Sequence, residues 1–151
     1  MMNVHAIGGS EMMRATVDKV RRSCEENGVE APLLIAVTVL TSSDDNVLRE
    51  TGIEGSVDEQ VVRLAKLTKD AGFDGVVASA REASIIRREL GDDFVIVTPG
   101  IRAKDATNDD QRRVMTFRDA MDLGASYAVI GRPITSAADR CIAVANIISG
   151  N

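Results

Sequence analysis

Short, continuously apolar runs alternate with amphipathic segments along this sequence, and this alternation limits the possible folds more than any other feature. The runs have the length of β-strands and comprise residues 2–6, 33–39, 75–78, 94–98 and 127–130. They are apolar at successive positions, which is typical of strands covered on both faces. Since parallel strands are joined by right-handed helical crossovers, we expect an α/β fold of about five parallel βα units. The pattern fits either an open doubly wound sheet or part of a closed barrel.

Most of the predicted helices begin and end at recognisable signals. Four segments match the capping box, in which a hydroxyl accepts a hydrogen bond from the third helical N–H and an acidic side chain accepts one from the cap. These predicted starts are Ser56, Ser79, Thr116 and Ser136. Glycine is favoured where a helix ends, because it adopts left-handed backbone without strain. The predicted ends are Gly28, Gly72, Gly91 and Gly124.

Apolar residues inside the helices recur at spacings of three and four, which gives each helix one apolar face. The stripes are Met13, Val17, Val20 and Cys24; then Val61, Leu64, Ala65 and Thr68; then Cys141, Val144, Ala145 and Ile148. The two cysteines, Cys24 and Cys141, stand on these stripes. We interpret them as small core residues in a reducing compartment, with a disulfide as the second choice.

The composition excludes several classes of function. The 151 residues suit one domain, and 27% of them are charged, as in ordinary globular proteins. Aromatic residues make up only 3%, which leaves little for stacking on nucleic-acid bases, and the net charge of −5 does not favour a polyanion partner. No window approaches about 18 consecutive apolar residues, so we expect no membrane span. The sequence predicts a single cytoplasmic domain, residues 1–151, with a small-molecule ligand and neither nucleic acid nor membrane as partner.

Glycine and arginine closely follow the last two predicted strands. One strand runs into I-G-R-P-I-T at residues 130–135, where Gly131 would let the backbone approach a phosphate oxygen and Arg132 could donate two hydrogen bonds to it. The strand before it ends in V-T-P-G-I-R at residues 97–102, so that Arg102 begins the next loop. In barrel enzymes the loops after the last two strands commonly bind phosphate. The alternative for residues 130–135 is a turn with a surface arginine.

Other polar side chains stand near the ends of two earlier strands. Thr41 and Ser42 follow the run at residues 33–39, where hydroxyls face the ligand-binding edge of a parallel sheet. A plain turn or helix cap explains either hydroxyl equally well. His5, the only histidine, ends the first run. It could be a general base, but a hydrogen-bonded core histidine is favoured, and a lone histidine without a cysteine nearby argues against zinc.

A resemblance to a known family rests on five sequence strings. In order they are N-V-H-A-I-G-G, L-L-I-A-V-T-V-L-T-S, V-T-P-G-I-R, D-Q-R-R-V-M-T and V-I-G-R-P-I-T. They resemble the carboxyl-terminal half of bacterial orotidine 5′-phosphate decarboxylases, which convert orotidine 5′-phosphate to UMP and CO₂ in pyrimidine biosynthesis. The resemblance implies a (β/α)8 TIM barrel, usually a homodimer, without cofactor or metal. It implies substrate contacts at Thr41, Arg102, Gln111, Gly131 and Arg132.

Gln111 is assigned through that resemblance alone. Its amide can donate and accept at once, so it could bridge a phosphate oxygen and a base carbonyl. Taken without the surrounding D-Q-R-R-V string, Gln111 would be interpreted as a polar residue at the start of a helix.

The family's catalytic lysine has no counterpart among these residues. It belongs to a lysine–aspartate array in a D-x-K-x-x-D-I-P context, where the lysine protonates the carbanion left by CO₂. Lys66, Lys69 and Lys104 lack that context. On the family's pattern Met1 falls at about the fourth strand, so we expect roughly the last five βα units, strands 4–8, with the array upstream of Met1. Such a chain should be inactive alone and should self-associate or take a companion segment.

Two alternatives remain open at this point. One is a related sugar-phosphate decarboxylase or aldolase of the same barrel type, which also ends in a G-R-x-I-T loop; these bind Mg²⁺ through acids on other strands, and the D-Q-R-R-V string argues against them. The other is a non-catalytic phosphate-binding or assembly domain, which the missing lysine favours.

Overall fold

The computed structural model describes residues 1–101 and 115–150. Its strands form one parallel sheet of five, in which each strand pairs with the next along the chain. They are β1 (Met2–His5), β2 (Leu34–Val37), β3 (Gly75–Val77), β4 (Val95–Pro99) and β5 (Tyr127–Val129). The strand order follows the sequence without the reversal of a doubly wound sheet, so the sheet has the order of a barrel.

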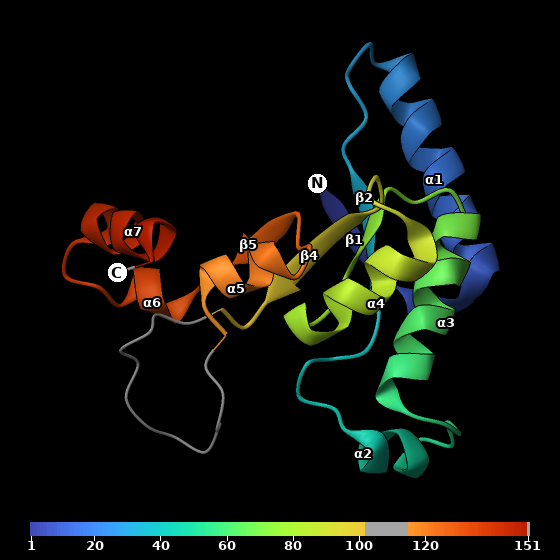
Figure 1. Ribbon diagram of the computed structural model, residues 1–151. Helices are drawn as coiled ribbons and strands as arrows, with labels where there is room; N and C mark the ends of the chain where they lie inside the picture. Colours follow the sequence, from blue (N-terminus) through green and yellow to red (C-terminus); the bar gives the residue numbers. More distant parts are fainter. Residues whose placement is uncertain (102–114, 151) are drawn as a thin grey trace.

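Helices return the chain from the end of one strand to the start of the next. The long ones are α1 (Gly9–Glu26), α3 (Val57–Asp70) and α4 (Ala80–Leu90), and they lie on the same side of the sheet (Figure 1). A short 3-10 turn, η1 (Ala6–Gly8), precedes α1, and α2 (Asp45–Glu50) stands apart from the sheet beyond the end of β2 (Figure 1). The chain ends in α5 (Phe117–Asp122), α6 (Arg132–Thr135) and α7 (Arg140–Ser149). None of the helices in these described ranges is long and apolar enough to cross a membrane.

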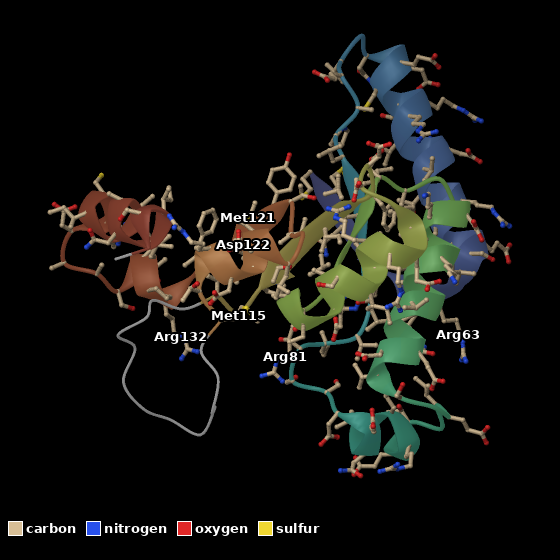
Figure 2. The ribbon with its side chains drawn as sticks, viewed as in Figure 1. Arg63, Arg81, Met115, Met121, Asp122 and Arg132 are labelled. Carbon is tan, nitrogen blue, oxygen red and sulfur yellow. The ribbon has the colours of Figure 1, made fainter. Side chains whose placement is uncertain are left out.

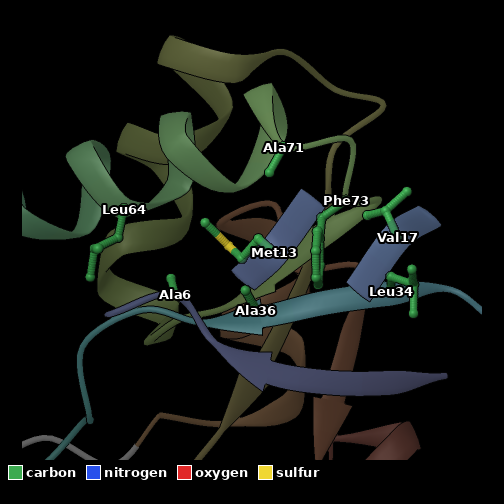
Figure 3. Packing of buried hydrophobic residues seen from close by; sticks show 8 residues of the cluster. All are labelled: Ala6, Met13, Val17, Leu34, Ala36, Leu64, Ala71 and Phe73. Carbon is green, nitrogen blue, oxygen red and sulfur yellow. The ribbon is translucent and has the colours of Figure 1, made fainter. Parts of the chain in front are cut away.

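The core lies between the sheet and the long helices. Met13 and Val17 of α1 pack against Leu34 and Ala36 of β2 and against Phe73, which precedes β3 (Figure 3). A second cluster joins α3 and α4 to the next two strands, and its members are Val61, Ala65, Val76, Ala78, Ala83, Ile86, Phe94 and Ile96. The first two predicted helical stripes therefore mark true core faces, which exclude water from one side of the sheet.

Among the residues that the structure describes, none gives the opposite face of the sheet such a cover at β5. Side chains alternate between the two faces of a strand, so Tyr127 and Val129 of β5 lie on the face opposite to Ala128, which packs on the helical side. Tyr127 is 49% exposed and Val129 is 53% exposed. The prediction of strands covered on both faces is thus wrong for β5, because in the described part of the chain the core clusters lie on the helical side.

Three of the four predicted capping boxes form. They are at Ser56, Ser79 and Thr116. The prediction at Ser136 is wrong, because α6 ends at Thr135 with Ser136 as its carboxyl-terminal cap, and Asp139 caps α7 by accepting a hydrogen bond from the backbone N–H of Ile142. The four glycines predicted to end helices all have positive φ, from 64° to 101°.

The third predicted stripe is wrong as well. Cys141, Val144, Ala145 and Ile148 are all exposed, and the buried residue of α7 is Ile147. The physical reason is that α7 contacts α5 and α6 through its Ile147 side, so its other apolar positions face outward. Cys141 is therefore not a core residue; Cys24 is half-buried, and both cysteines are free.

One arginine links the last strand to the rest of the sheet. Arg87 of α4 donates hydrogen bonds to the carbonyl of Gly124 (Nε, 2.9 Å), the carbonyl of Asp92 (2.9 Å) and Oγ of Ser126 (2.9 Å). Ser126 Oγ in turn accepts from the backbone N–H of Ile96 at 3.1 Å. The starts of β4 and β5 are thus joined to the end of α4 by charge-assisted bonds.

Candidate functional site

A cavity lies where β2, β3 and β4 end. Its volume is about 160 Å³, and it is lined by Val37, Val39, Leu40, Thr41, Ser42, Val77, Ala78 and Pro99. Ligands of parallel sheets bind at the carboxyl ends of the strands, so this is the expected place for a site. The volume matches that of an apolar cavity that takes one six-membered ring, on the order of 150 Å³.

Thr41 reaches this cavity because the chain is held firmly just before it. Both the backbone N–H and Oγ1 of Thr38 donate to the carbonyl of Val77, at 3.1 and 2.9 Å. This double contact continues the pairing of β2 and β3 beyond the last ladder residue, and the next residues then leave the sheet along the cavity. Thr41 itself is exposed, so its hydroxyl is open to a ligand.

Gly131 and Arg132 follow β5, on the neighbour of the strand that supplies Pro99 to the cavity. Both are exposed, and a side chain added at Gly131 would meet nothing within 4 Å. The backbone N–H of Gly131 is thus sterically approachable, although its φ of −100° does not require glycine. In Figure 2 Arg132 lies nearer to Arg81 than to Arg63, which lies on α3 at the other side of the view. An exposed guanidinium of this kind can bind an anion.

Two predicted contacts, Arg102 and Gln111, lie outside the described residues. The residues just before them match the predicted turn: Gly100 has φ of 82°, a left-handed conformation that favours glycine, and Ile101 is buried. Of the predicted site residues, the structure therefore places Thr41 on the cavity and Gly131 and Arg132 after the adjacent strand.

His5 is exposed, so its interpretation as a hydrogen-bonded core residue is wrong. It pairs in register with Val37, which lines the cavity. Paired residues of parallel strands share one face, so His5 lies on the uncovered face at the same end of the sheet. The burial was overestimated because β1 is an outer strand in this sheet.

Sequence reasoning did not select three residues that shape this end of the sheet. Val77 and Ala78 line the cavity at the end of β3, and Arg81 lies in the first turn of α4, between Arg132 and Arg63 in the view of Figure 2. The rule that ligands gather at carboxyl ends of strands could have found Val77 and Ala78, since the apolar run at residues 75–78 ends with them. Arg81 looked like an ordinary residue within a capping box.

Glu82 is the most perturbed acid in this neighbourhood. Its carboxylate accepts a hydrogen bond from the backbone N–H of Ser79 at 2.8 Å, and the residue is only 7% exposed. Burial raises the pKa of Glu82 to about 7; the Ser79 bond opposes this shift, and the negative charge of Asp58 adds to it. The carboxyl group of Glu82 therefore keeps its proton to a higher pH than an exposed glutamate does.

The described part of the chain holds no group of three His, Cys, Asp or Glu side chains that could bind a metal ion. What these residues offer is a small, largely apolar cavity with hydroxyls at its rim and an arginine after the adjacent strand. Such a site can hold a flat ring and an anionic group at once.

Known proteins are similar to this sequence over nearly its whole length. A family model described as "Orotidine 5'-phosphate decarboxylase / HUMPS family" matches residues 1–147. The orotidine 5′-phosphate decarboxylase of Rhodospirillum rubrum is 53% identical over 150 residues, which cover 99% of this chain and 60% of that protein. The enzyme of Moorella thermoacetica is 55% identical over 140 residues, covering 92% of this chain and 56% of that protein. The chain thus spans about three fifths of the length of these relatives.

Solved structures agree with this similarity. Orotidine 5′-phosphate decarboxylase from Lactobacillus acidophilus superimposes with a TM-score of 0.80 at 40% identity, covering 98% of this chain and 61% of the other. An uncharacterized conserved protein from Geobacillus kaustophilus gives a TM-score of 0.81 at 38% identity, covering 99% and 62%. The five parallel βα units are therefore part of a TIM barrel, as the resemblance implied. With a family match over residues 1–147, this chain belongs to the orotidine 5′-phosphate decarboxylase / HUMPS family.

Proposed function

We propose that residues 1–151 form a single domain that supplies the phosphate- and pyrimidine-binding part of an orotidine 5′-phosphate decarboxylase. The reaction is the conversion of orotidine 5′-phosphate to UMP and CO₂. The observation that carries the proposal is the cavity at the ends of β2, β3 and β4, with Arg132 after the neighbouring strand. The enzyme would act in the cytoplasm, as a homodimer, on a small-molecule substrate without cofactor or metal.

The cavity would hold the pyrimidine base, and the residues that follow β5 would bind the phosphate. A pyrimidine ring has the size of the cavity, and the hydroxyls of Thr41 and Ser42 stand at its rim to hydrogen-bond the polar edge of that ring. Gly131 would offer its backbone N–H, and Arg132 its guanidinium, to the phosphate. Arg102 and Gln111, which follow β4, would complete the phosphate and base contacts.

The other readings of the sequence are less well supported. The curated relatives are named orotidine 5′-phosphate decarboxylases, which favours that substrate over other sugar phosphates. The family's D-x-K-x-x-D-I-P string does not occur among the 151 residues. We therefore expect this chain to bind ligand without turning it over by itself, because a proton donor is needed to complete decarboxylation.

Binding of UMP tests the proposed function directly. The change is Arg132→Ala, which should weaken UMP binding by about tenfold or more, since a charge-assisted hydrogen bond contributes roughly 1.5–3 kcal/mol. The measurement is titration calorimetry with UMP on the wild-type chain and on the variant.

The matched control is Arg63→Ala. Arg63 is also exposed, but it lies on α3, at the other side of the view from Arg132 (Figure 2), and it does not line the cavity. It should bind UMP as the wild type does. Equal affinity of the two variants, or no binding by the wild-type chain, would contradict the assignment of the phosphate contact to Arg132.

A further inference from the structure

Arg87 lies in the last turn of α4, is half-buried, and donates hydrogen bonds to five neutral oxygens. A guanidinium carries five N–H groups in one rigid plane, so a single side chain can hold several segments in a fixed geometry. The acceptors are the carbonyls of Gly91 (3.1 Å), Asp92 (2.9 Å), Phe94 and Gly124 (2.9 Å), and Oγ of Ser126 (2.9 Å). Arg87 thus ties together the two connections that lead into β4 and β5.

Two other basic side chains make a simpler link of the same kind. Arg21 of α1 donates to the carbonyl of Gly72, just after α3, at 3.1 Å. Lys69 of α3 donates to the carbonyl of Leu90, at the end of α4, at 2.6 Å. Each of these joins the ends of two successive long helices through one carbonyl. Of the three described links, only that of Arg87 continues to the residue that precedes a strand, so its action extends beyond holding helix ends together.

The connection before β5 is shaped to receive Arg87. Gly124 has φ of 101°, a left-handed conformation that favours glycine. A side chain added at Gly124 would also place its Cβ 2.9 Å from Cγ of Arg87, which is closer than two carbon atoms can pack. The stem of Arg87 therefore occupies the space that any other residue at position 124 would need.

Ser126 passes the hold of Arg87 on to the strand pair. Its backbone N–H donates to the carbonyl of Ile96 at 2.8 Å, and its Oγ accepts from the N–H of Ile96 at 3.1 Å as well as from Arg87. Ser126 thus uses both backbone groups of Ile96, which fixes the register in which Tyr127 pairs with Val97. Since β5 has only three residues and pairs with β4 alone among the described strands, this register depends on few bonds.

The register of β5 decides where the proposed phosphate contacts lie. Gly131 and Arg132 come shortly after Val129, the last residue of β5. A shift of the strand by one residue would move them by about 3.3 Å and would exchange the two faces of the strand. Such a displacement is larger than the whole length of a hydrogen bond between N–H and oxygen, roughly 2.7–3.2 Å.

We propose that Arg87 is a positioning residue for the phosphate contact. It lies at the amino-terminal ends of β4 and β5, whereas the cavity lies at the carboxyl ends of the strands, so it acts without touching the ligand. By fixing the start of β5 against β4, it sets the places of the Gly131 N–H and the Arg132 guanidinium relative to the cavity. The inference rests on the proposed function, because it names what holds the proposed phosphate-binding residues.

A pair of substitutions at Arg87 and Arg132 tests this role. Arg87→Met removes every donor of the guanidinium but keeps a straight stem beside Gly124. UMP binding, measured by titration calorimetry on the 151-residue chain, should weaken about tenfold, as it should in Arg132→Ala. In the Arg132→Ala background, Arg87→Met should change the affinity by less than about twofold, because the contact that Arg87 positions is already lost. A merely structural role would weaken binding by the same factor in both backgrounds.

Two control variants separate positioning from a general loss of stability. Arg21→Met removes the corresponding link between α1 and Gly72 and should bind UMP as the wild type does. Met13→Ala opens the first core cluster and lowers stability, but it leaves the bonds of Arg87 intact. It too should bind UMP with wild-type affinity at a temperature where the chain is folded.

Amide hydrogen exchange provides a measurement that needs no ligand. In Arg87→Met the amide of Ser126 should exchange faster than in the wild type, since its bond to Ile96 is less firmly held. The amide of Ala78, which donates to Val97 on the other side of β4, serves as the internal reference and should keep its protection. If Arg87→Met does not fold, Ser126→Ala provides the same tests, because it removes one acceptor of Arg87 and leaves the other four. It should weaken UMP binding by a smaller factor, again only when Arg132 is present.

The outcomes distinguish this inference from the proposed function. Wild-type UMP affinity in Arg87→Met, an equal loss in both backgrounds, or unchanged protection of Ser126 overturns the positioning role, while the weakening by Arg132→Ala would still support the function. Loss of UMP binding in Arg21→Met or Met13→Ala overturns it as well, because binding would then follow stability alone. If the wild-type chain does not bind UMP, the proposed function is contradicted, and the positioning role that rests on it is overturned with it.

Discussion

Two regions of this molecule differ sharply in how they are stabilised. The body, residues 1–101, has four strands and three long helices, with side chains such as Met13, Val61 and Ile86 fully buried. The terminal region, residues 115–150, has one strand and three short helices, and its buried apolar residues are Ala120, Ala125 and Ile147. Yet Gly131 and Arg132, the proposed phosphate contacts, belong to the terminal region. The proposed binding residues thus lie in the region with few buried apolar residues, whereas the well-packed core belongs to the body.

Truncating one isoleucine in each region tests most directly whether the body is better packed than the terminal region. Ile86→Ala in the body should lower the free energy of unfolding by about 2–5 kcal/mol, since it opens a cavity among tightly packed groups. Ile147→Ala in the terminal region should cost less, because its surroundings can collapse more easily. Ile148→Ala, at an exposed position of the same helix, should change stability by no more than about 0.5 kcal/mol.

Urea denaturation of the three variants provides the measurement. If Ile147→Ala were as destabilising as Ile86→Ala, the terminal region would be as well packed as the body. The contrast between the two regions would then be wrong.

The pH dependence of stability should arise in the body, at Glu82. Its pKa is raised from 4.5 to about 7 in the folded chain, so the folded state binds the proton more tightly than the unfolded state does. The stabilising effect is complete below about pH 4.5 and is lost as the pH rises toward 7, a change of at most about 3 kcal/mol. Glu82→Gln should remove this slope between pH 5 and pH 8, as measured by urea denaturation at several pH values.

A suitable control is Glu59→Gln, at the same position of the capping box of α3. The pKa of Glu59 is lowered by its hydrogen bonds to Ser56, so its contribution to stability has the opposite sign with pH. A stability profile of Glu82→Gln that still falls between pH 5 and pH 8 would show that another group titrates there.

Substitutions at the helix caps should change stability least, and one cap from each region can be compared. Ser56→Ala should cost about 1 kcal/mol, because it removes a hydroxyl that accepts from the backbone N–H of Glu59. Ser136→Ala in the terminal region should cost nothing measurable, because Asp139 is the cap of α7. The measurement is the thermal unfolding temperature of both variants. If Ser136→Ala lowered it more than Ser56→Ala does, the assignment of Asp139 as the cap of α7 would be wrong.

The sequence predicted the body better than the terminal region, for a physical reason. In the body, stripes such as Val61, Leu64 and Ala65 face a neighbouring sheet, so periodicity and burial coincide. In α7 the apolar positions at Val144 and Ile148 have the same periodicity, but the described chain provides nothing for them to pack against. Periodicity shows which side of a helix is apolar; it does not show whether a partner is present.

The sequence indicated which edge of the sheet to inspect but not every residue that lines the cavity there. Thr41 lies on this cavity, because strand ends gather at one edge of a parallel sheet, and its contact with a substrate stays a prediction. The contributions of Val77 and Ala78 were missed because apolar residues at a strand end carry no distinctive signal. The exposure of His5 was missed because its burial depends on which strand lies beside β1, and sequence periodicity contains no such information.

The order of the strands also affects how such a chain gains structure during synthesis. Every strand after the first pairs with the one that came just before it, separated by a single helix-containing connection. Each new unit can therefore settle on a surface that already exists as it leaves the ribosome, since domains form from the amino-terminal side first. None of the five described strands must wait for a partner made much later, so their pairing avoids the slow and entropically costly joining of segments that are remote in sequence.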